Sequence, residues 1–147
     1  MATFARHVDV EWTGTLMEGS GTAKAGTGAF SMPVTFPSRI SEKGDTKTTP
    51  EELLAASHAV CYTMVLTNTI VKQGGKASRV RVTATVTADK GDAGIKVVSS
   101  HLDATVEGLE GLDKAGLQEL ATGAEKGYPI SNAIRGTVAI TVTATAS

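Results

Sequence analysis

One long apolar segment in the middle of the chain constrains the fold more than any other feature. Residues 49–52, TPEE, have the composition of a helix start. Thr49 can accept a hydrogen bond from an unpaired N–H, Pro50 suits the first helical position, and Glu52 completes a T-x-x-E capping box. The apolar run that follows ends at Gly74-Gly75, a typical C-terminal stop. These signals predict one helix of about 24 residues, roughly 36 Å long at 1.5 Å per residue.

The predicted helix is apolar on nearly every side. One face, at the 3, 4, 7 spacing of a helix, carries Leu54, Ser57, His58, Cys61, Met64, Val65 and Asn68. The other faces carry Leu53, Ala56, Val60, Leu66 and Ile70. Because a helix that is apolar all round is normally buried, we expect a second subunit to cover part of it in so short a chain. The sequence therefore predicts a homodimer.

Length and charge limit the function classes. At 147 residues we expect one domain, 1–147, with a real hydrophobic core. The net charge is −1, and no basic stripe or basic amphipathic segment is present, so we expect neither a nucleic-acid nor a membrane partner. The N-terminal residues lack the apolar core of a signal peptide, and polar residues such as His58 and Asn68 argue against a membrane-spanning helix.

The remaining segments predict strands before and after the helix. Before the helix we expect a half-buried strand at 7–12, a short edge strand within 19–28, and a strand at 30–36 that Pro33 confines to an edge. After the helix we expect paired strands at 80–87 and 95–106, with a turn at 89–92 and a bulge at Val97-Val98. The chain then continues with a helix capped by Asp113 and ended by Gly127, a short turn at 130–134, and a last strand at 137–145. This order predicts an α+β fold with antiparallel sheets.

Cys61 is the only cysteine and has two interpretations. A lone cysteine on an apolar helix face is usually an inert core residue. Reactive use requires a cation or a helix N-terminus nearby, and Cys61 lies too far along its helix to gain from that helix's own dipole. One cysteine cannot form an intrachain disulfide, so we expect a reducing, cytoplasmic setting. Three dispersed histidines and one cysteine give no metal-ligand spacing, and we expect no metal or cofactor.

The segment around Cys61 resembles a known family. TTPEELLAASHAVCYTM is similar to the TNPEEL…AAHAxCFSM segment of the OsmC/Ohr family, the osmotically inducible protein C and organic hydroperoxide resistance thiol peroxidases. The resemblance extends to VEWTG near the N-terminus, to the Arg before the polar loop, and to AGIKVVSSHLDATVEGLEGLD after the helix. GYPISNAIRG falls where the family has G-C-P-V/I-S.

The resemblance implies an intertwined homodimer in which antiparallel sheets wrap around long central helices. It also implies an antioxidant, oxidative-stress enzyme that reduces organic hydroperoxides or hydrogen peroxide. Carried over by motif, Cys61 is the peroxidatic thiol, Arg39 its activating cation and Glu51 the carboxylate that orients Arg39. Three further side chains are candidates for the binding site: Tyr128, His58 and Met64. For His58, packing in the core is the alternative to pairing with the thiolate.

Helix geometry favours a site shared between two chains. Glu51 and Cys61 are ten residues apart on one helix, so about 15 Å apart along its axis. Two such helices packed antiparallel around a two-fold axis could bring Glu51 of one chain towards Cys61 of the other, since a symmetric contact is reciprocal. Stabilisation of the helix dipole by Glu51 is the alternative.

The departure from the family pattern is Tyr128, which stands where the family carries its resolving cysteine. A tyrosine cannot condense with a sulfenic acid to form a disulfide. The chain is therefore either a one-Cys peroxidase recycled by an external thiol or a relative that has lost efficient turnover. Tyr128 could donate a hydrogen bond into the site, or simply fill the volume and pack against the central helix. The other functions left open are a non-catalytic protein that binds a hydrophobic ligand at the dimer interface and a structural stress protein with an inert thiol.

Overall fold

A computed structural model describes residues 1–147 and confirms the central helix, α2, as Pro50–Lys72. At its start the N–H of Glu52 donates to Thr49 Oγ1 at 3.1 Å, as a capping box requires. At its end Gly74 has a φ of +84°, and its N–H donates to the Val71 carbonyl at 3.0 Å. The N–H of Gly75 reaches the Ile70 carbonyl at 3.0 Å, which completes a Schellman motif.

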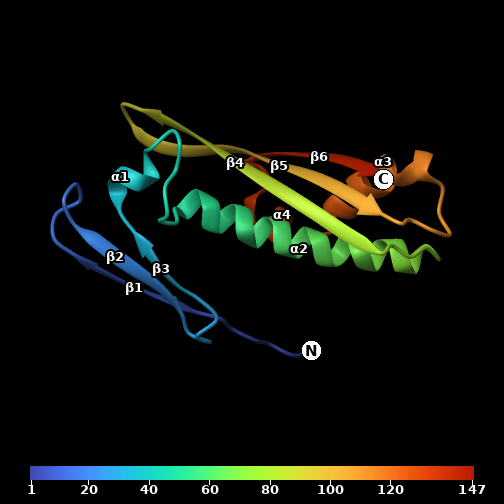
Figure 1. Cartoon of the computed structure of the whole chain (residues 1–147), viewed down its shortest axis with the longest axis horizontal. Helices are drawn as coiled ribbons and strands as arrows, with labels where there is room; N and C mark the ends of the chain where they lie inside the picture. Colours follow the sequence, from blue (N-terminus) through green and yellow to red (C-terminus); the bar gives the residue numbers. More distant parts are fainter. The chain divides into compact units, whose positions relative to one another are not determined.

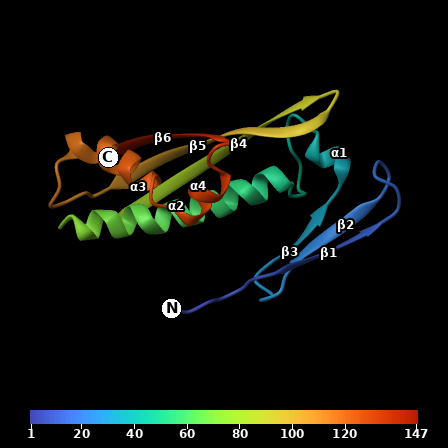
Figure 2. The same cartoon turned by 180° about the vertical axis from the view of Figure 1, so that it is seen from behind.

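The chain divides into two units, Met1–Leu53 and Leu54–Ser147, and Figures 1 and 2 label their elements. In chain order the elements are β1 (Val8–Thr13), β2 (Ser20–Ala25), β3 (Ser31–Val34), α1 (Phe36–Arg39), α2 (Pro50–Lys72), β4 (Arg79–Gly91), β5 (Gly94–Glu107), the 3-10 turn η1 (Lys114–Gly116), α3 (Leu117–Glu125), α4 (Pro129–Ile134) and β6 (Ala139–Ala146). The helix capped by Asp113 thus begins with η1 and continues as α3.

The first unit contains an antiparallel sheet in the order β1-β2-β3. Pro33 lies in edge strand β3, as predicted, but the prediction that 19–28 forms an edge strand is wrong, because β2 is the central strand. The central position of β2 favours its small residues, because neighbouring strands approach it closely on both sides. A Cβ on Gly21 would come within 2.8 Å of the Trp12 ring on β1, so only glycine fits at this point of the sheet.

Strand β1 forms at the predicted position but is not half-buried. All six of its residues are exposed, including the apolar Val8, Val10 and Trp12. The alternation of apolar and polar residues identified the strand, but burial depends on what covers the apolar side. Within this chain Val8, Val10 and Trp12 stay 49%, 63% and 40% exposed.

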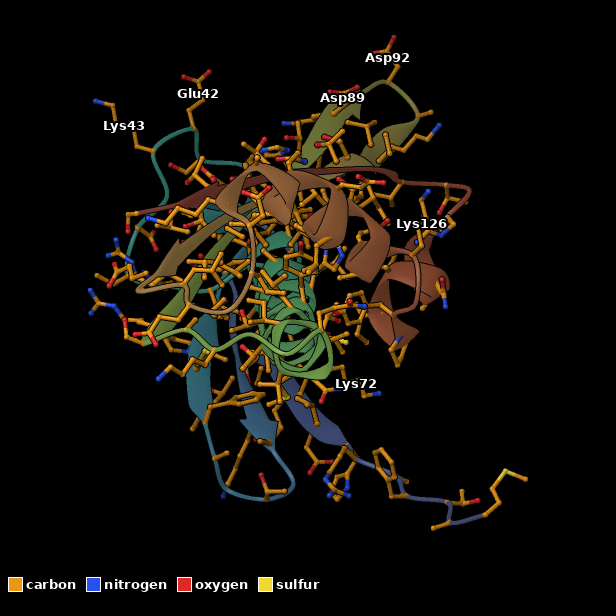
Figure 3. The ribbon with its side chains drawn as sticks, turned by 90° about the vertical axis from the view of Figure 1, so that its right-hand side faces the viewer. Glu42, Lys43, Lys72, Asp89, Asp92 and Lys126 are labelled. Atoms are coloured by element: carbon orange, nitrogen blue, oxygen red, sulfur yellow. The ribbon has the colours of Figure 1, made fainter.

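The second unit is built on a mixed sheet in the order β4-β5-β6. β4 and β5 form a long antiparallel hairpin, and Asp89 and Asp92 project from its tip (Figure 3). Pairing continues to Gly91 and Gly94, so the turn lies about two residues later than predicted. The predicted bulge is confirmed: Thr87 pairs with Ser99 and Ala88 with Val97, which leaves Val98 as the extra residue.

The expectation of a wholly antiparallel sheet is wrong at one pair, because β6 runs parallel to β5. The reason is the connection between them. A hairpin joins antiparallel neighbours through a few residues, whereas a parallel pair needs a long crossover. Here η1, α3 and α4 form that crossover. The α+β class itself is confirmed.

The core lies between helices α2 and α3 and the inner face of the second sheet. Every fourth residue of α2 is buried: His58, Tyr62, Leu66 and Ile70. These side chains meet a cluster that includes Leu102, Ala104 and Val106 of β5 and Leu117 and Ala121 of α3. Of the seven residues on the face that carries Cys61, only His58 is buried in this chain.

The rest of α2 leaves apolar side chains at the surface of this chain. Val60, Met64 and Val71 are all more than half exposed. By length and composition alone α2 could cross a membrane. Its buried face packs instead on the cluster of the second unit. An isolated chain therefore buries one stripe of α2 and leaves the others uncovered.

We expect Leu66→Ala to lower the free energy of unfolding by about 2–5 kcal/mol, because it deletes a fully buried side chain and leaves a cavity. Urea unfolding followed by circular dichroism measures this change. The neighbouring exposed Thr67→Ala serves as control and should shift stability by no more than about 0.5 kcal/mol. Equal effects of the two substitutions would contradict the position of the buried stripe.

Candidate active site

Cys61 lies near the middle of α2 with its thiol free and half-buried. It packs against the core cluster that contains Tyr62 and Tyr128. Val60 and Met64, its neighbours on the helix, are exposed. Met64, predicted as a binding residue, is thus one turn from Cys61 on the uncovered side of α2.

Tyr128 is fully buried against the turn of α2 that carries Cys61. Its ring meets that of Tyr62 edge to face, with centroids 5.6 Å apart, and its hydroxyl donates to the Tyr62 carbonyl at 3.3 Å. Burial raises the pKa of Tyr128, and the negative charge of a Cys61 thiolate raises that pKa further. Tyr128 is therefore a neutral phenol that fills the volume, and its hydroxyl is bonded to a backbone carbonyl rather than to the thiol.

His58 is also buried, and both of its ring nitrogens have partners. Nδ1 lies 2.7 Å from Ser100 Oγ on β5, and Nε2 lies 2.9 Å from Ser131 Oγ on α4. Burial lowers the pKa of His58, and the negative charge of Glu125 opposes this only in part. A neutral imidazole offers one donor and one acceptor, and the serine hydroxyls can complement both.

Arg39 and Glu51 form the other polar cluster, in the first unit. Arg39 ends α1 and Glu51 lies in the first turn of α2. Arg39 Nη2 donates to Glu51 Oε1 at 2.8 Å, and Nε donates to Oε1 and Oε2 at 3.2 and 3.3 Å. Such a fork-to-carboxylate pair fixes the plane of the guanidinium. Burial alone raises the pKa of Glu51, but hydrogen bonding and charge from Arg39 outweigh it and hold that pKa below its usual 4.5.

Three residues that the sequence analysis missed, Thr35, Ser38 and Asp45, form a hydrogen-bond network beside Arg39. Ser38 is buried and its hydroxyl donates to Asp45 Oδ2 at 2.6 Å. Thr35 Oγ1 lies 2.6 Å from the same hydroxyl and accepts the N–H of Ser38 as the cap of α1. The hydrogen bond from Ser38, together with that from the Lys47 N–H, lowers the pKa of Asp45. Only the clustering of Ser, Thr and Asp around residue 39 could have indicated this network.

The six predicted site residues thus form two groups. Arg39 contacts Glu51, while Tyr128 packs against the turn of Cys61, with His58 and Met64 one turn away on either side. Glu51 and Cys61 share α2 but lie ten residues, about 15 Å, apart along it. One helix therefore cannot bring the ion pair and its own thiol together.

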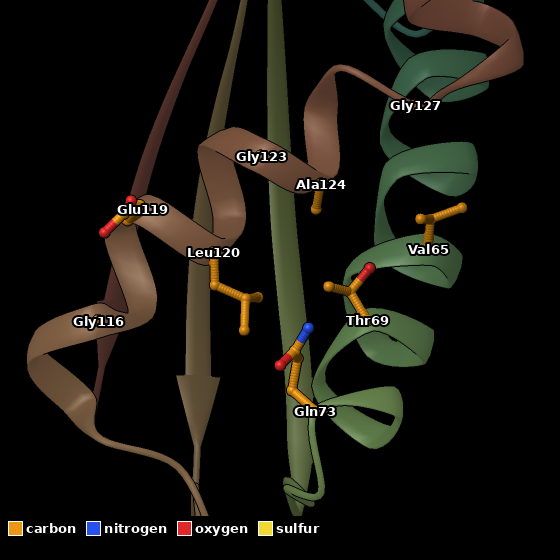
Figure 4. A pocket seen from close by; sticks show the side chains of 9 residues that line it. All are labelled: Val65, Thr69, Gln73, Gly116, Glu119, Leu120, Gly123, Ala124 and Gly127. Carbon is orange, nitrogen blue, oxygen red and sulfur yellow. The ribbon is translucent and has the colours of Figure 1, made fainter.

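Each unit contains a hollow on its surface. In the second unit a groove of about 630 Å³ separates α2 from α3, and Leu120, Thr69 and Gln73 point into it (Figure 4). In the first unit a smaller pocket of about 280 Å³ is mostly apolar and has Arg39 in its wall, with Trp12, Leu16 and Phe36 among the other lining residues. No group of three or more His, Cys, Asp or Glu side chains is placed to hold a metal ion.

We expect Arg39→Ala to raise the pKa of Glu51, because burial remains while the stabilising cation is lost. A carboxylate with a lowered pKa stabilises the folded state above its unfolded pKa and loses that contribution as the pH falls through the lowered value. Carbon-13 NMR titration of the Glu51 carboxyl measures the shift. Arg79→Ala, which disrupts the separate Arg79–Glu107 pair, should leave the Glu51 titration unchanged.

Comparison with known proteins identifies the family. A family model described as OsmC-like protein matches residues 42–143. Peroxiredoxin OsmC of Escherichia coli (strain K12) is 28% identical over 139 residues, which cover 94% of this chain and 95% of the relative. The organic hydroperoxide resistance protein of Xanthomonas axonopodis pv. citri (strain 306) is 29% identical over 126 residues, 84% of each chain.

Solved structures agree with the family assignment. The crystal structure of an organic hydroperoxide resistance protein from Elizabethkingia anophelis is similar over 100% of both chains, with a TM-score of 0.76 and 25% identity. The fold of a Legionella pneumophila organic hydroperoxide resistance protein is also similar, with a TM-score of 0.75 over 99% of both chains and 23% identity. The arrangement of helices and sheets is thus that of the OsmC/Ohr fold, and the chain belongs to the OsmC-like protein family.

Proposed function

We propose that this protein is a thiol peroxidase that reduces organic hydroperoxides, or hydrogen peroxide, through Cys61. Relatives named peroxiredoxin OsmC and organic hydroperoxide resistance protein support the reaction class. The observation that carries the proposal is the bidentate Arg39–Glu51 pair, which holds a guanidinium in a fixed plane beside the start of the helix that bears the only thiol.

The proposed reaction has an oxidative and a reductive half. The Cys61 thiolate attacks one peroxide oxygen, an S–O bond forms as the O–O bond breaks, and the alkoxide leaves as an alcohol after taking a proton. Cys61 is then a sulfenic acid. An external thiol condenses with it to give a mixed disulfide and water. A second external thiol releases the Cys61 thiolate and leaves as the disulfide, so that two thiols are oxidised for each peroxide reduced.

In this proposal Arg39 stabilises the thiolate and the leaving oxygen, and Glu51 orients Arg39. Because α2 separates Glu51 from its own Cys61 by about 15 Å, the pair of one chain would serve Cys61 of the other chain in a homodimer. The exposed apolar residues Val60, Met64 and Val71 support such a dimer, since they leave α2 a surface for a second copy to cover. We propose the cytoplasm as the site of action, because recycling needs a supply of reduced thiols.

A second function, binding of a hydrophobic ligand without catalysis, is favoured by one observation. The pocket of the first unit is mostly apolar, and Arg39 in its wall could meet a polar end of a ligand. The two functions differ in the fate of Cys61. A binding protein with an inert thiol leaves Cys61 reduced when peroxide is added, and so does a structural stress protein.

We expect one equivalent of cumene hydroperoxide to convert Cys61 to a sulfenic acid that dimedone traps, because the chain has no second thiol to condense with it. Mass spectrometry of the adduct measures the yield. A small thiol added after the peroxide and before dimedone should return Cys61 to the reduced form, so that no adduct forms. Cys61→Ser should give no adduct either. A wild-type chain that remains fully reduced would refute the peroxidase proposal.

We expect Arg39→Ala to slow oxidation of Cys61 at neutral pH by about tenfold or more. A guanidinium within about 4–6 Å stabilises the anionic form of an acid by one to three pKa units, and the thiolate is the reacting form. Stopped-flow oxidation under excess peroxide gives the rate constant. Arg79→Ala removes an arginine of a different ion pair and should leave the rate within about twofold of wild type. Equal rates in wild type and Arg39→Ala would remove Arg39 from the mechanism.

A further inference from the structure

Helix α4 is attached to α2 at two adjacent points. Ser131 of α4 hydrogen-bonds to His58, and Tyr128, the residue before α4, hydrogen-bonds to the carbonyl of Tyr62. His58 and Tyr62 are one turn apart on α2, so the two contacts lie on the same stripe of that helix. Both contacts are buried, and Cys61 adjoins the second of them in the chain.

An ion pair also joins the two ends of the segment that carries Tyr128. Glu125 is the last residue of α3, and Arg135 caps the C-terminal end of α4. Arg135 Nη2 donates to Glu125 Oε1 at 2.8 Å and to the Glu125 backbone carbonyl at 3.4 Å, while Nη1 lies 3.4 Å from Oε2. Residues 126–134, which include α4, therefore form a segment whose two ends are joined by the ion pair between Glu125 and Arg135.

Arg135 is difficult to replace, because it is the cation that pairs with the buried Glu125 carboxylate. Glu125 is only 6% exposed, and the ion pair with Arg135 is its salt bridge. Removing Arg135 leaves a carboxylate buried without its cation, which is strongly unfavourable. Glu125 would then have to move towards water, and the loop that it anchors would move with it.

We infer that Arg135 and Glu125, together with the His58–Ser131 hydrogen bond, form a clamp that positions residue 128 against the turn of α2 bearing Cys61. The inference rests on the proposed function in one respect, since it matters for catalysis only if Cys61 is the reacting group. Arg135 touches neither the thiol nor a substrate in this arrangement and is a positioning residue. The consequence is that a fixed phenol occupies the side of Cys61 that faces α4, and an incoming thiol must approach from elsewhere.

A thiol placed at position 128 can report this positioning without any peroxide. In Tyr128→Cys, the equilibrium between the dithiol and the intrachain 61–128 disulfide is measured in a glutathione redox buffer by mass spectrometry. The ratio of disulfide to dithiol at a known glutathione redox ratio gives the effective concentration of one thiol near the other. A clamped loop should give a value well above the millimolar range typical of short flexible linkers.

The clamp is then weakened in the same background. Adding Arg135→Ala should lower the effective concentration at least tenfold, and Arg135→Lys, which keeps the cation, should recover part of the loss. Ser131→Ala removes the other attachment and should also lower it. Arg79→Ala is the matched control, because it disrupts an ion pair of similar length in the same unit and should change nothing.

Two results would overturn the inference. One is a folded Tyr128→Cys protein, by circular dichroism, that forms no 61–128 disulfide. The other is an effective concentration that neither Arg135→Ala nor Ser131→Ala lowers. If Arg135→Ala does not fold, Ser131→Ala decides alone. Because no peroxide is used, the result is independent of the proposed activity: a wild-type chain inert to peroxide would end the peroxidase proposal and leave the clamp measurement intact.

Discussion

Helix α2 is the constraint on which the rest of the structure depends. Its stripe His58, Tyr62, Leu66 and Ile70 forms one wall of the core, and the same rigid cylinder carries Glu51 near one end and Cys61 near the middle. A helix cannot bend to bring residues ten positions apart into contact, so the ion pair and the thiol remain about 15 Å apart along it. The proposed chemistry therefore requires two copies of the helix.

Around Cys61, buried polar groups are satisfied by one another. His58 is bonded to two serine hydroxyls, Tyr128 to a backbone carbonyl, and Glu125 to Arg135. No buried side-chain nitrogen or oxygen lacks a partner. Such a network holds one arrangement, because breaking any contact leaves a desolvated polar group. The Cys61 thiol, by contrast, is free and half-buried, and we propose that this leaves it available to substrate.

Local signals predicted much of the fold. The capping box at Thr49, the glycine stop at Gly74 and the bulge at Val98 were all predictable, because each depends on residues close in sequence. The central position of β2, the parallel pairing of β6 and the buried phase of α2 depend on distant partners. Arg39 contacts Glu51, and the catalytic roles that the family resemblance implied for the two residues stay predictions. The partners of His58 and the Arg135–Glu125 pair join segments far apart in sequence and leave no periodic pattern.

The central claim, that the Arg39–Glu51 pair of one chain serves Cys61 of the other, is tested most directly by complementation. Arg39→Ala and Cys61→Ser chains are co-expressed with different tags, and the mixed dimer is isolated. The account predicts one complete site, built from Arg39 of one chain and Cys61 of its partner, and hence up to about half the wild-type peroxidase rate per dimer, while each parent dimer has little or none. A mixed dimer no more active than its parents would contradict the account.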